Sequence, residues 1–373
     1  GAGTVLSGTT VTTNGTLVGG SHSLAITGDA VFGNESTDTV TGLTTLAVSG
    51  TSAINSSDIT STLTQDYTGA VTLGDDTTLS GQGISFSSTI VSDGTNRALI
   101  VNDSGTTTFG GVVGSTTVAD QLTSLTTDAG GSTTINGGAV YTTAAQTYND
   151  NVILGAGTVL SGTTVTTNGT LVAAGHSLGI IGDAVFGDET TDIVTGLTTL
   201  DVSGATTINT DTITSADAQT YTGAVILGNS TTLTATDDPI LFSSTVNSEA
   251  TKANGMTVNV GSGDVTFTAA VGVVVDGELG ALSVNSTGLT QFTAAINAAS
   301  VATNIGGTLE INGGSVTTSG VQTYGENLTL GANTVLQGTT VTTNGTVSGA
   351  GNYSLNVTGD AVFGNESTDT VTG

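Results

Sequence analysis

Several kinds of residue are absent or rare in this chain, and each gap excludes a class of protein. There is no cysteine and no tryptophan, and proline and methionine occur once each. Without cysteine, neither disulfides nor thiolate chemistry can contribute. Only Arg97 and Lys252 are basic against 30 acidic residues, which gives a formal net charge of −28. Because binding to nucleic acid and to anionic membrane surfaces depends on Lys and Arg, both partners are excluded.

Long apolar runs and helix-favouring residues are also missing. No apolar run approaches the ~20 residues needed to cross a bilayer, so membrane insertion is not expected. Lys, Arg, Glu and Gln, the usual residues of helix surfaces, are scarce, whereas threonine and valine favour half-buried strands. Disorder would suit a glycine-rich acidic chain, but apolar positions recur regularly, which disordered chains lack. The composition therefore predicts an all-β protein.

Internal repeats organise the sequence. Residues 1–50 recur at 155–204 with 41 of 50 positions identical, and a third copy begins at Gly331. A Gln-x-Tyr tripeptide recurs at Gln65, Gln146, Gln219 and Gln322 and separates two kinds of segment, A and B. The segments follow in the order A (1–64), B (65–145), A (146–218), B (219–321) and A (322–373), with the first and last A segments partial.

The spacing of these repeats predicts the size of one structural coil. The A copies begin at Gly1, Gly155 and Gly331, and the second B segment is longer than the first by the difference between the two intervals. The intervals are seven and eight times about 22 residues, so we expect coils averaging ~20–22 residues, within the range of stacked solenoids, and roughly 17–19 coils in all. The second B segment is then expected to contain one extra coil.

The local pattern within a coil is strand, turn, strand. Segments such as Val71-Thr72-Leu73 and Ile84-Ser85-Phe86 alternate apolar with small polar residues, and glycine or Asn-Gly pairs separate them. Such segments are typical of short strands joined at tight corners. Asn-Gly pairs such as Asn14-Gly15 are also typical of β-hairpins, so tandem β-sandwich domains are the alternative fold. Sandwich repeats run to ~100 residues around larger side chains, so we predict one continuous parallel β-solenoid over residues 1–373.

Two stretches carry a resemblance to a known family. The run QTYNDNVILGAGTVLSGTTVTTNG (146–169) and the run LTSLTTDAGGSTTINGG (122–138), in their A-B alternation, resemble the repeat region of filamentous-haemagglutinin-like exoproteins. The resemblance implies a right-handed β-helix secreted by a Gram-negative bacterium, extracellular or attached to the cell surface. It implies a role in adhesion, biofilm or filament formation, and partners that are either further copies of the chain, end to end or side by side, or a host or neighbouring cell surface or matrix. The family's secretion domain is not in this sequence, which we interpret as a segment of a longer shaft.

Acidic turns are the main candidate binding site. The motif G-D-A-V-F-G-[ND]-E-x-T-D occurs in each A copy, and calcium prefers several oxygen ligands. The calcium candidates are the acidic residues of this motif in the three copies: Asp29, Glu35, Asp38, Asp183, Glu189, Asp192, Asp360, Glu366 and Asp369. Against them, no loop matches the EF-hand or the glycine-rich nonapeptide pattern, so solvated acidic turns are the plainer interpretation.

The remaining candidate functional residues have weaker support in the sequence. His22 and His176 are equivalent in two A copies, but a catalytic residue repeated along a repeat array is implausible, and we expect no catalytic residue and no cofactor beyond possible calcium. The Thr-Thr-Val-Thr-Thr motif (9–13) could order water in an ice-binding face, but it returns only once per super-repeat, which is the interval from the start of one A copy to the start of the next. Asp237-Asp238 before Pro239 predicts a small bulge or loop.

The sequence as a whole favours a non-enzymatic structural or adhesive shaft. The alternative is a repetitive surface that binds calcium, glycan or ice. Regular outward side chains on every coil would favour the alternative, whereas regularity confined to the interior would favour the shaft.

Overall fold

The computed structural model describes residues 3–274, 277–349 and 351–372, which form two compact units, residues 1–182 and 183–373. Both units are all-β and are built from parallel strands stacked as a β-solenoid, with about 18 turns in total. The outermost residues of the expected first and last A segments, residue 350 and residues 275–276 of the second B segment lie outside the described part. None of the described residues forms a helix long and apolar enough to cross a membrane.

Unit 1 contains short strands and one 3₁₀ helix, and most of its strands are three to seven residues long. In chain order they are β1 (Thr4–Thr13), β2 (Leu17–Phe32), β3 (Thr39–Val48), β4 (Ser52–Ile54), β5 (Asp58–Ser61), β6 (Gln65–Tyr67), β7 (Val71–Leu73), β8 (Thr77–Gly81), β9 (Ile84–Phe86), β10 (Ile90–Ser92), β11 (Arg97–Asp103), β12 (Thr106–Phe109), η1 (Val118–Asp120), β13 (Leu122–Thr127), β14 (Ser132–Ile135), β15 (Ala139–Tyr141), β16 (Gln146–Tyr148), β17 (Asn151–Leu154) and β18 (Thr158–Thr167).

Unit 2 follows the same plan, and β19 (Leu171–Phe186) extends from one unit into the next. Its strands are β20 (Ile193–Val202), β21 (Thr206–Ile208), β22 (Thr212–Ser215), β23 (Gln219–Tyr221), β24 (Val225–Leu227), β25 (Thr231–Ala235), β26 (Ile240–Phe242), β27 (Val246–Ser248), β28 (Met256–Gly261), β29 (Val265–Phe267), β30 (Leu279–Ser286), β31 (Leu289–Phe292), β32 (Ile296–Thr303), β33 (Thr308–Ile311), β34 (Ser315–Thr318), β35 (Gln322–Tyr324), β36 (Asn327–Leu330), β37 (Thr334–Thr343), β38 (Val347–Gly349), β39 (Leu355–Phe363) and β40 (Val371–Thr372).

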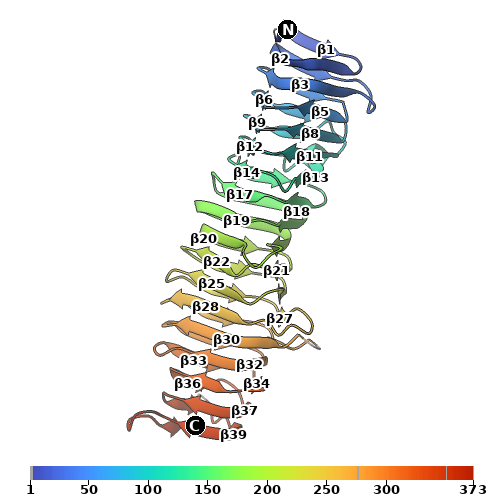
Figure 1. Ribbon diagram of the computed structural model, residues 1–373. Coiled ribbons are helices and arrows are strands. Elements are labelled where there is room, and N and C mark those ends of the chain that lie inside the picture. The colour runs from blue at the N-terminus through green and yellow to red at the C-terminus, as the bar shows by residue number, and fades with distance from the viewer. Residues whose placement is uncertain (1–2, 275–276, 350, 373) are drawn as a thin grey trace. The chain divides into compact units, whose positions relative to one another are not determined.

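Each coil of unit 1 has three faces, and each face pairs in parallel register with the same face of the next coil (Figure 1). We call them the first face (β6, β9, β12), the second face (β4, β7, β10) and the third face (β5, β8, β11). Coils differ in length: Ser52 pairs with Val71 on the next coil, whereas Leu99 pairs with Leu125. These intervals, from about 19 to about 26 residues, bracket the coil size expected from the sequence.

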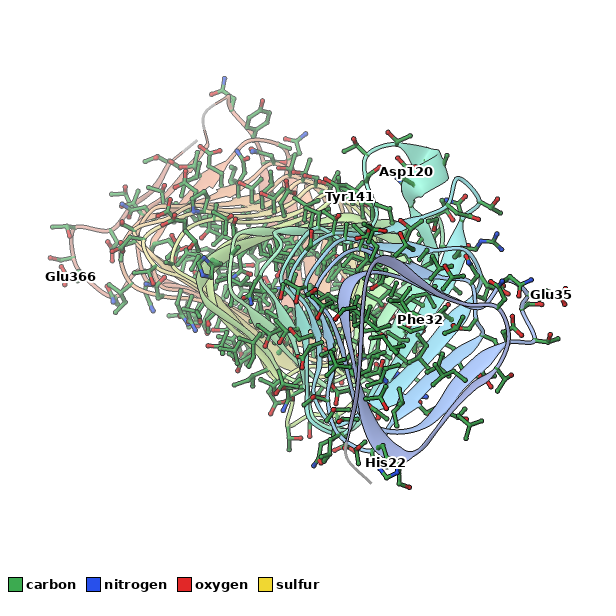
Figure 2. All side chains as sticks on the ribbon, turned by 90° about the horizontal axis from the view of Figure 1, so that it is seen from above. His22, Phe32, Glu35, Asp120, Tyr141 and Glu366 are labelled. Carbon is green, nitrogen blue, oxygen red and sulfur yellow. The ribbon has the colours of Figure 1, made fainter. Side chains whose placement is uncertain are left out.

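The core consists of columns of like side chains, one from each coil. On the first face of unit 1, Tyr67, Phe86 and Phe109 stack with ring centroids 5.2 and 5.6 Å apart and nearly parallel planes. Strand alternation places these residues inside and small polar residues outside, as the period-2 pattern predicts. All three rings are at most 1% exposed, so the interior is filled. Figure 2 shows Phe32 of β2 pointing into the same interior.

Unit 2 repeats this aromatic column with one more ring. In unit 2 the first face is formed by β23, β26, β29 and β31, the second face by β24 and β27, and the third face by β22, β25 and β28. Tyr221, Phe242, Phe267 and Phe292 follow one another on this first face, with centroid separations of 5.3, 4.8 and 5.8 Å. In unit 1 the last aromatic residue of the column is Phe109, and the next coil contributes Ile135. In unit 2 the last aromatic residue is Phe292, one coil further along than Phe109 in unit 1, and the next coil contributes Ile311. The additional length of the second B segment therefore adds one complete coil.

The super-repeat does not return to its starting face, which the repeat spacing alone does not predict. In unit 1, Leu6 of the first A copy pairs with Ile26 and starts the column that leads through Tyr67 to Leu154 on the first face. Its equivalent in the second copy, Leu160, pairs with Val140 on the second face. The interval between the two copies thus covers seven coils and one further face, so its coils average about 21 residues, in the middle of the expected range.

Glycines allow the close approach of neighbouring coils at the corners. Gly131 has φ +74°, and a Cβ on it would overlap the carbonyl oxygen of Gly105 on the preceding coil. At Asp237-Asp238, where the sequence predicts a small bulge or loop, the chain bends between β25 and β26: Asp237 has φ +59°, and its carboxylate accepts a hydrogen bond from the Ser262 N–H at 2.9 Å.

Candidate functional surfaces

The acidic turns of the A copies are shaped by their own aspartates. In the first copy, Asp38 Oδ2 accepts hydrogen bonds from the backbone N–H groups of Asn34 and Glu35, at 2.9 and 3.1 Å. Asp192 and Asp369 make the same pair of contacts in the second and third copies. These carboxylates therefore satisfy turn N–H groups that would otherwise lack a protein acceptor.

The remaining calcium candidates fall into two groups. Asp29 and Asp183 each accept a hydrogen bond from a backbone N–H of the following coil, at 2.8 Å, and so tie adjacent coils together. Asp360 is their exposed equivalent in the third copy. Glu35, Glu189 and Glu366 are exposed, and Figure 2 shows Glu35 projecting from a corner of unit 1. Among residues 3–274, 277–349 and 351–372, no three His, Cys, Asp or Glu side chains are close enough together to hold a metal ion.

Both basic residues of the chain occupy equivalent corners, three coils after an acidic turn. Arg97 contacts Asp93 through two nitrogens, at 3.1 and 3.2 Å, and approaches Asp75 at 3.9 Å. This partnership lowers the pKa of Asp93. In unit 2, Lys252 pairs with Glu249 at 2.7 Å. Each cation is therefore engaged by an acid of its own corner loop.

Each Gln-x-Tyr tripeptide forms a buried polar clasp, a role that the sequence analysis did not assign. Gln146 Nε2 donates to the carbonyls of Val140 and Ser161, at 3.1 and 2.9 Å, and Tyr148 Oη donates to Gln146 Oε1 at 3.0 Å. Both side chains are 0% exposed, and burial strongly raises the pKa of the Tyr148 hydroxyl. The glutamine thus fastens a corner of its own coil to the next one.

The same clasp recurs in every Gln-x-Tyr. The Tyr Oη to Gln Oε1 distances are 2.8 Å at Tyr67, 2.9 Å at Tyr221 and 2.8 Å at Tyr324. A sequence signal was available, because Gln and Tyr two residues apart share one face of a strand, and an inward glutamine needs polar partners.

Two buried acids lie four residues after the glutamine in the A segments. Asp150 is 5% exposed and accepts hydrogen bonds from the hydroxyls of Thr127 and Thr133, both at 2.9 Å. Burial raises its pKa to about 6, although the two threonines act in the opposite direction. Glu326 is 4% exposed, and burial raises its pKa to about 7 against a hydrogen bond from Thr303. Both groups therefore titrate well above the ordinary range of carboxyls.

A file of small side chains runs along the outside of the third face of unit 2. Cross-coil register aligns Thr212, Thr232, Thr257, Ser283, Ala302, Thr323 and Thr342. These residues come from several unrelated sequence motifs, so an array expected once per super-repeat is in fact present on successive coils.

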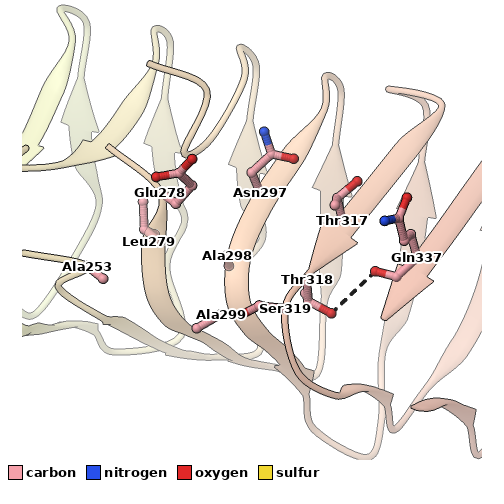
Figure 3. A pocket seen from close by; sticks show the side chains of 10 residues that line it. All are labelled: Ala253, Glu278, Leu279, Asn297, Ala298, Ala299, Thr317, Thr318, Ser319 and Gln337. Atoms are coloured by element: carbon pink, nitrogen blue, oxygen red, sulfur yellow. Dashed lines mark hydrogen bonds between the residues drawn. The ribbon is translucent and has the colours of Figure 1, made fainter. Parts of the chain in front are cut away.

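A groove follows the corner between the second and third faces of unit 2. Its largest section has a volume of about 580 Å³ and lies between Ala253 and Gln337, where Figure 3 shows Glu278, Asn297, Thr317 and Gln337 in a row. A second section of about 350 Å³ shares Ala253 with the first. A third, of about 520 Å³, begins at Asp188 and Glu189 of the acidic turn and also includes Lys252. We call these three sections together the corner groove.

The two histidines are not brought into a chemical site. His22 is half-buried among aliphatic side chains that include Leu17, Leu24 and Leu43. His176 is half-buried at the equivalent position of the second copy. Each follows a left-handed residue pair, with Ser21 at φ 62° and Ala174 at φ 52°, which marks a bend in a long strand.

Comparison with known proteins gives no relative: no family model, no curated protein and no solved structure matches this chain.

Proposed function

We propose that this chain is a non-enzymatic, extracellular shaft with a structural and adhesive role, of the kind formed by the repeats of bacterial surface exoproteins. The extracellular setting and the bacterial origin rest on the resemblance of the A and B segments to filamentous-haemagglutinin-like repeats. Adhesion, filament formation and a contribution to biofilm follow from the same resemblance.

The observation that carries the proposal is the regular filling of each unit's interior. Aromatic and aliphatic columns continue from coil to coil with almost no exposed surface, and the Gln–Tyr clasps bind successive corners. Each coil packs on its neighbours along the stack, so resistance to bending comes from many similar interfaces in series. Such a structure is suited to transmitting force and to holding something at a distance.

The arrangement of polar residues supports a non-enzymatic role. General acid–base chemistry needs a proton-transferring group within reach of another polar group in a recess. Here Asp38 and its equivalents cap turns, Asp29 and Asp183 bridge coils, and His22 lies among leucines. The most perturbed carboxyls, Asp150 and Glu326, are enclosed under neighbouring coils and have little access to a substrate.

Electrostatics influences how such shafts would associate. A net charge of −28 opposes side-by-side packing at low ionic strength, and divalent cations would weaken that repulsion. Calcium is thus proposed as a counterion for exposed glutamates such as Glu35 and Glu189. By weakening the repulsion between chains, it would promote lateral or end-to-end assembly.

Electron microscopy of the purified protein, with calcium and with a chelator, tests this proposal. Discrete rods or long uniform filaments would support the shaft, and filaments that form only with calcium would support a role of the acidic turns in assembly. Globular beads in both conditions would refute it.

A second candidate function is a repetitive ligand-binding surface, which the threonine file of unit 2 favours. Hydroxyl and methyl groups recur there at the coil spacing of about 4.8 Å, a regularity suited to ordering water at an ice surface. Thermal hysteresis measurements on the protein and on a Thr257→Tyr variant would test this function. Hysteresis that disappears in the variant would support it, and its absence from the unmodified protein would reject it.

A further inference from the structure

We propose that the corner groove of unit 2 binds a neutral, hydroxyl-rich glycan chain lying along the solenoid axis. This inference rests on the proposed adhesive function and names the class of molecule that one surface would hold. Its argument comes from the shape of the groove, from its unused hydrogen-bonding groups and from its charge.

The groove has the shape needed for an extended polymer. Its sections follow one another along a single corner, from the acidic turn at Asp188 through Ala253 to Gln337. Ala253, Ala298 and Ala299 lie in its largest section, and their small side chains leave the corner recessed. A ligand can therefore approach the backbone of several consecutive coils at once.

Polar side chains stand at coil intervals along this recess (Figure 3). Asn297 is in register with Thr317, and Thr317 is in register with Gln337, so one amide, one hydroxyl and one amide follow on three consecutive coils. Neighbouring strands lie about 4.8 Å apart, which sets the interval between these groups. A chain molecule with a donor or acceptor on each unit could contact all three.

These three side chains are not used within the described part of the protein. Elsewhere in unit 2, outward amides find partners on adjacent coils: Asn285 donates to the Asn259 amide oxygen at 2.7 Å, and Gln291 donates to the Glu310 carboxylate at 2.9 Å. In the groove, the hydrogen bond drawn in Figure 3 joins the Thr318 hydroxyl to the backbone carbonyl of Gln337, which leaves the Gln337 amide free. The groove thus presents amide donors and acceptors to solvent in a fixed row.

The charge of the groove selects against acidic ligands. Among the described residues that line its largest section, Glu278 is the only charged one, and Lys252, at the far end of the groove, is paired with Glu249 at 2.7 Å. With 30 acidic residues in the chain, a sulfated or uronate-containing polymer would be repelled. Amides and hydroxyls without an available cation match the hydroxyl groups of a neutral glycan.

Affinity electrophoresis through gels that contain a neutral polysaccharide, hydroxyethyl cellulose or galactomannan, tests the inference, with alginate as the acidic comparison. The test variant is Asn297→Ala/Gln337→Ala, and the matched control is Thr220→Ala/Thr266→Ala, which removes two outward hydroxyls from the first face. We expect retardation by at least one neutral gel, an affinity about tenfold lower in the test variant, and no change in the control.

Three outcomes would overturn the inference: no retardation by either neutral gel, equal retardation of the protein and the test variant, or stronger retardation by alginate. Circular dichroism of both variants identifies a folding defect, and in that case Ala299→Glu, which places a charge at the exposed floor of the groove, gives an independent test. Electron microscopy separates this inference from the shaft proposal, because rods that fail to bind glycan refute only the groove.

Discussion

The Gln–Tyr clasp makes a quantitative prediction about how coils are held together. Replacing Gln146 with leucine keeps a side chain of similar size but removes its hydrogen bonds to the Val140 and Ser161 carbonyls. It also leaves the buried Tyr148 hydroxyl without its acceptor. Each lost bond costs about 1 kcal/mol, and an unsatisfied buried hydroxyl costs about 1–3 kcal/mol. We therefore expect Gln146→Leu to destabilise its coil by about 3–5 kcal/mol.

Tyr148→Phe is the partner variant. It removes one hydrogen bond and leaves Gln146 Oε1 without that donor, so a loss of about 1–3 kcal/mol is expected. In the double variant Gln146→Leu/Tyr148→Phe, the stranded hydroxyl no longer exists. The double variant should consequently be more stable, by about 1–2 kcal/mol, than the sum of the two single losses.

Native-state hydrogen exchange is the appropriate assay, because a stack of coils need not unfold in one step. The amides to follow are those of β16, where the clasp lies, with β6 as an internal reference. Thr147→Ala, between the two clasp residues and outward-facing, is the control and should change stability by less than about 0.5 kcal/mol. Additive losses in the double variant, or a loss below about 1 kcal/mol for Gln146→Leu, would refute the clasp as a source of stability.

Three further predictions concern other parts of the molecule. Because burial raises the pKa of Glu326 to about 7, the folded state holds its proton more tightly than the unfolded state; that stabilisation is complete below about pH 4.5 and is lost as the pH rises through 7. Urea unfolding at pH 5 and pH 7.5 should therefore show a pH dependence on the order of 2 kcal/mol smaller in Glu326→Gln than in the unmodified protein, and equal dependences would contradict the assignment. Phe86→Ala should cost about 3–5 kcal/mol by opening a cavity between Tyr67 and Phe109, measured by thermal unfolding, whereas a cost under about 1 kcal/mol would mean that the column collapses. Asp38→Ala should speed proteolysis in the first acidic turn while overall stability falls by no more than about 2 kcal/mol, and an unchanged cleavage rate would show that its two N–H contacts do not order the turn.

The sequence predicted the fold because inner and outer positions alternate in most of the strands. Val71 and Leu73 are fully buried with Thr72 between them half-exposed, as alternation requires. Glycines and short polar residues marked the corners for a similar reason, since only some residues fit left-handed backbone. The parallel stacking then followed from the repeat length.

Other features could not be read from the sequence, because they depend on cross-coil register. Leu6 and Leu160 lie in identical local sequences, which do not indicate which of the three faces each residue occupies. The offset of one face per super-repeat was therefore not predicted. The threonine file has the same origin, since Thr257 and Thr323 come from unrelated motifs. The acidic turns were found, but the commitment of Asp38 and Asp192 to their own N–H groups is evident only from the structure.

The one-face offset has a consequence for any partner that approaches from one side. Within unit 2, the turn that ends at Asp192 leads onto the third face, whereas the equivalent turn that ends at Asp369 leads onto the first face. In unit 2 these two equivalent turns therefore lead onto different faces, and a partner that approaches the Asp192 turn from one side does not meet the Asp369 turn. The extra coil of the second B segment does not change the offset between them, because one complete coil returns the chain to the face that it left.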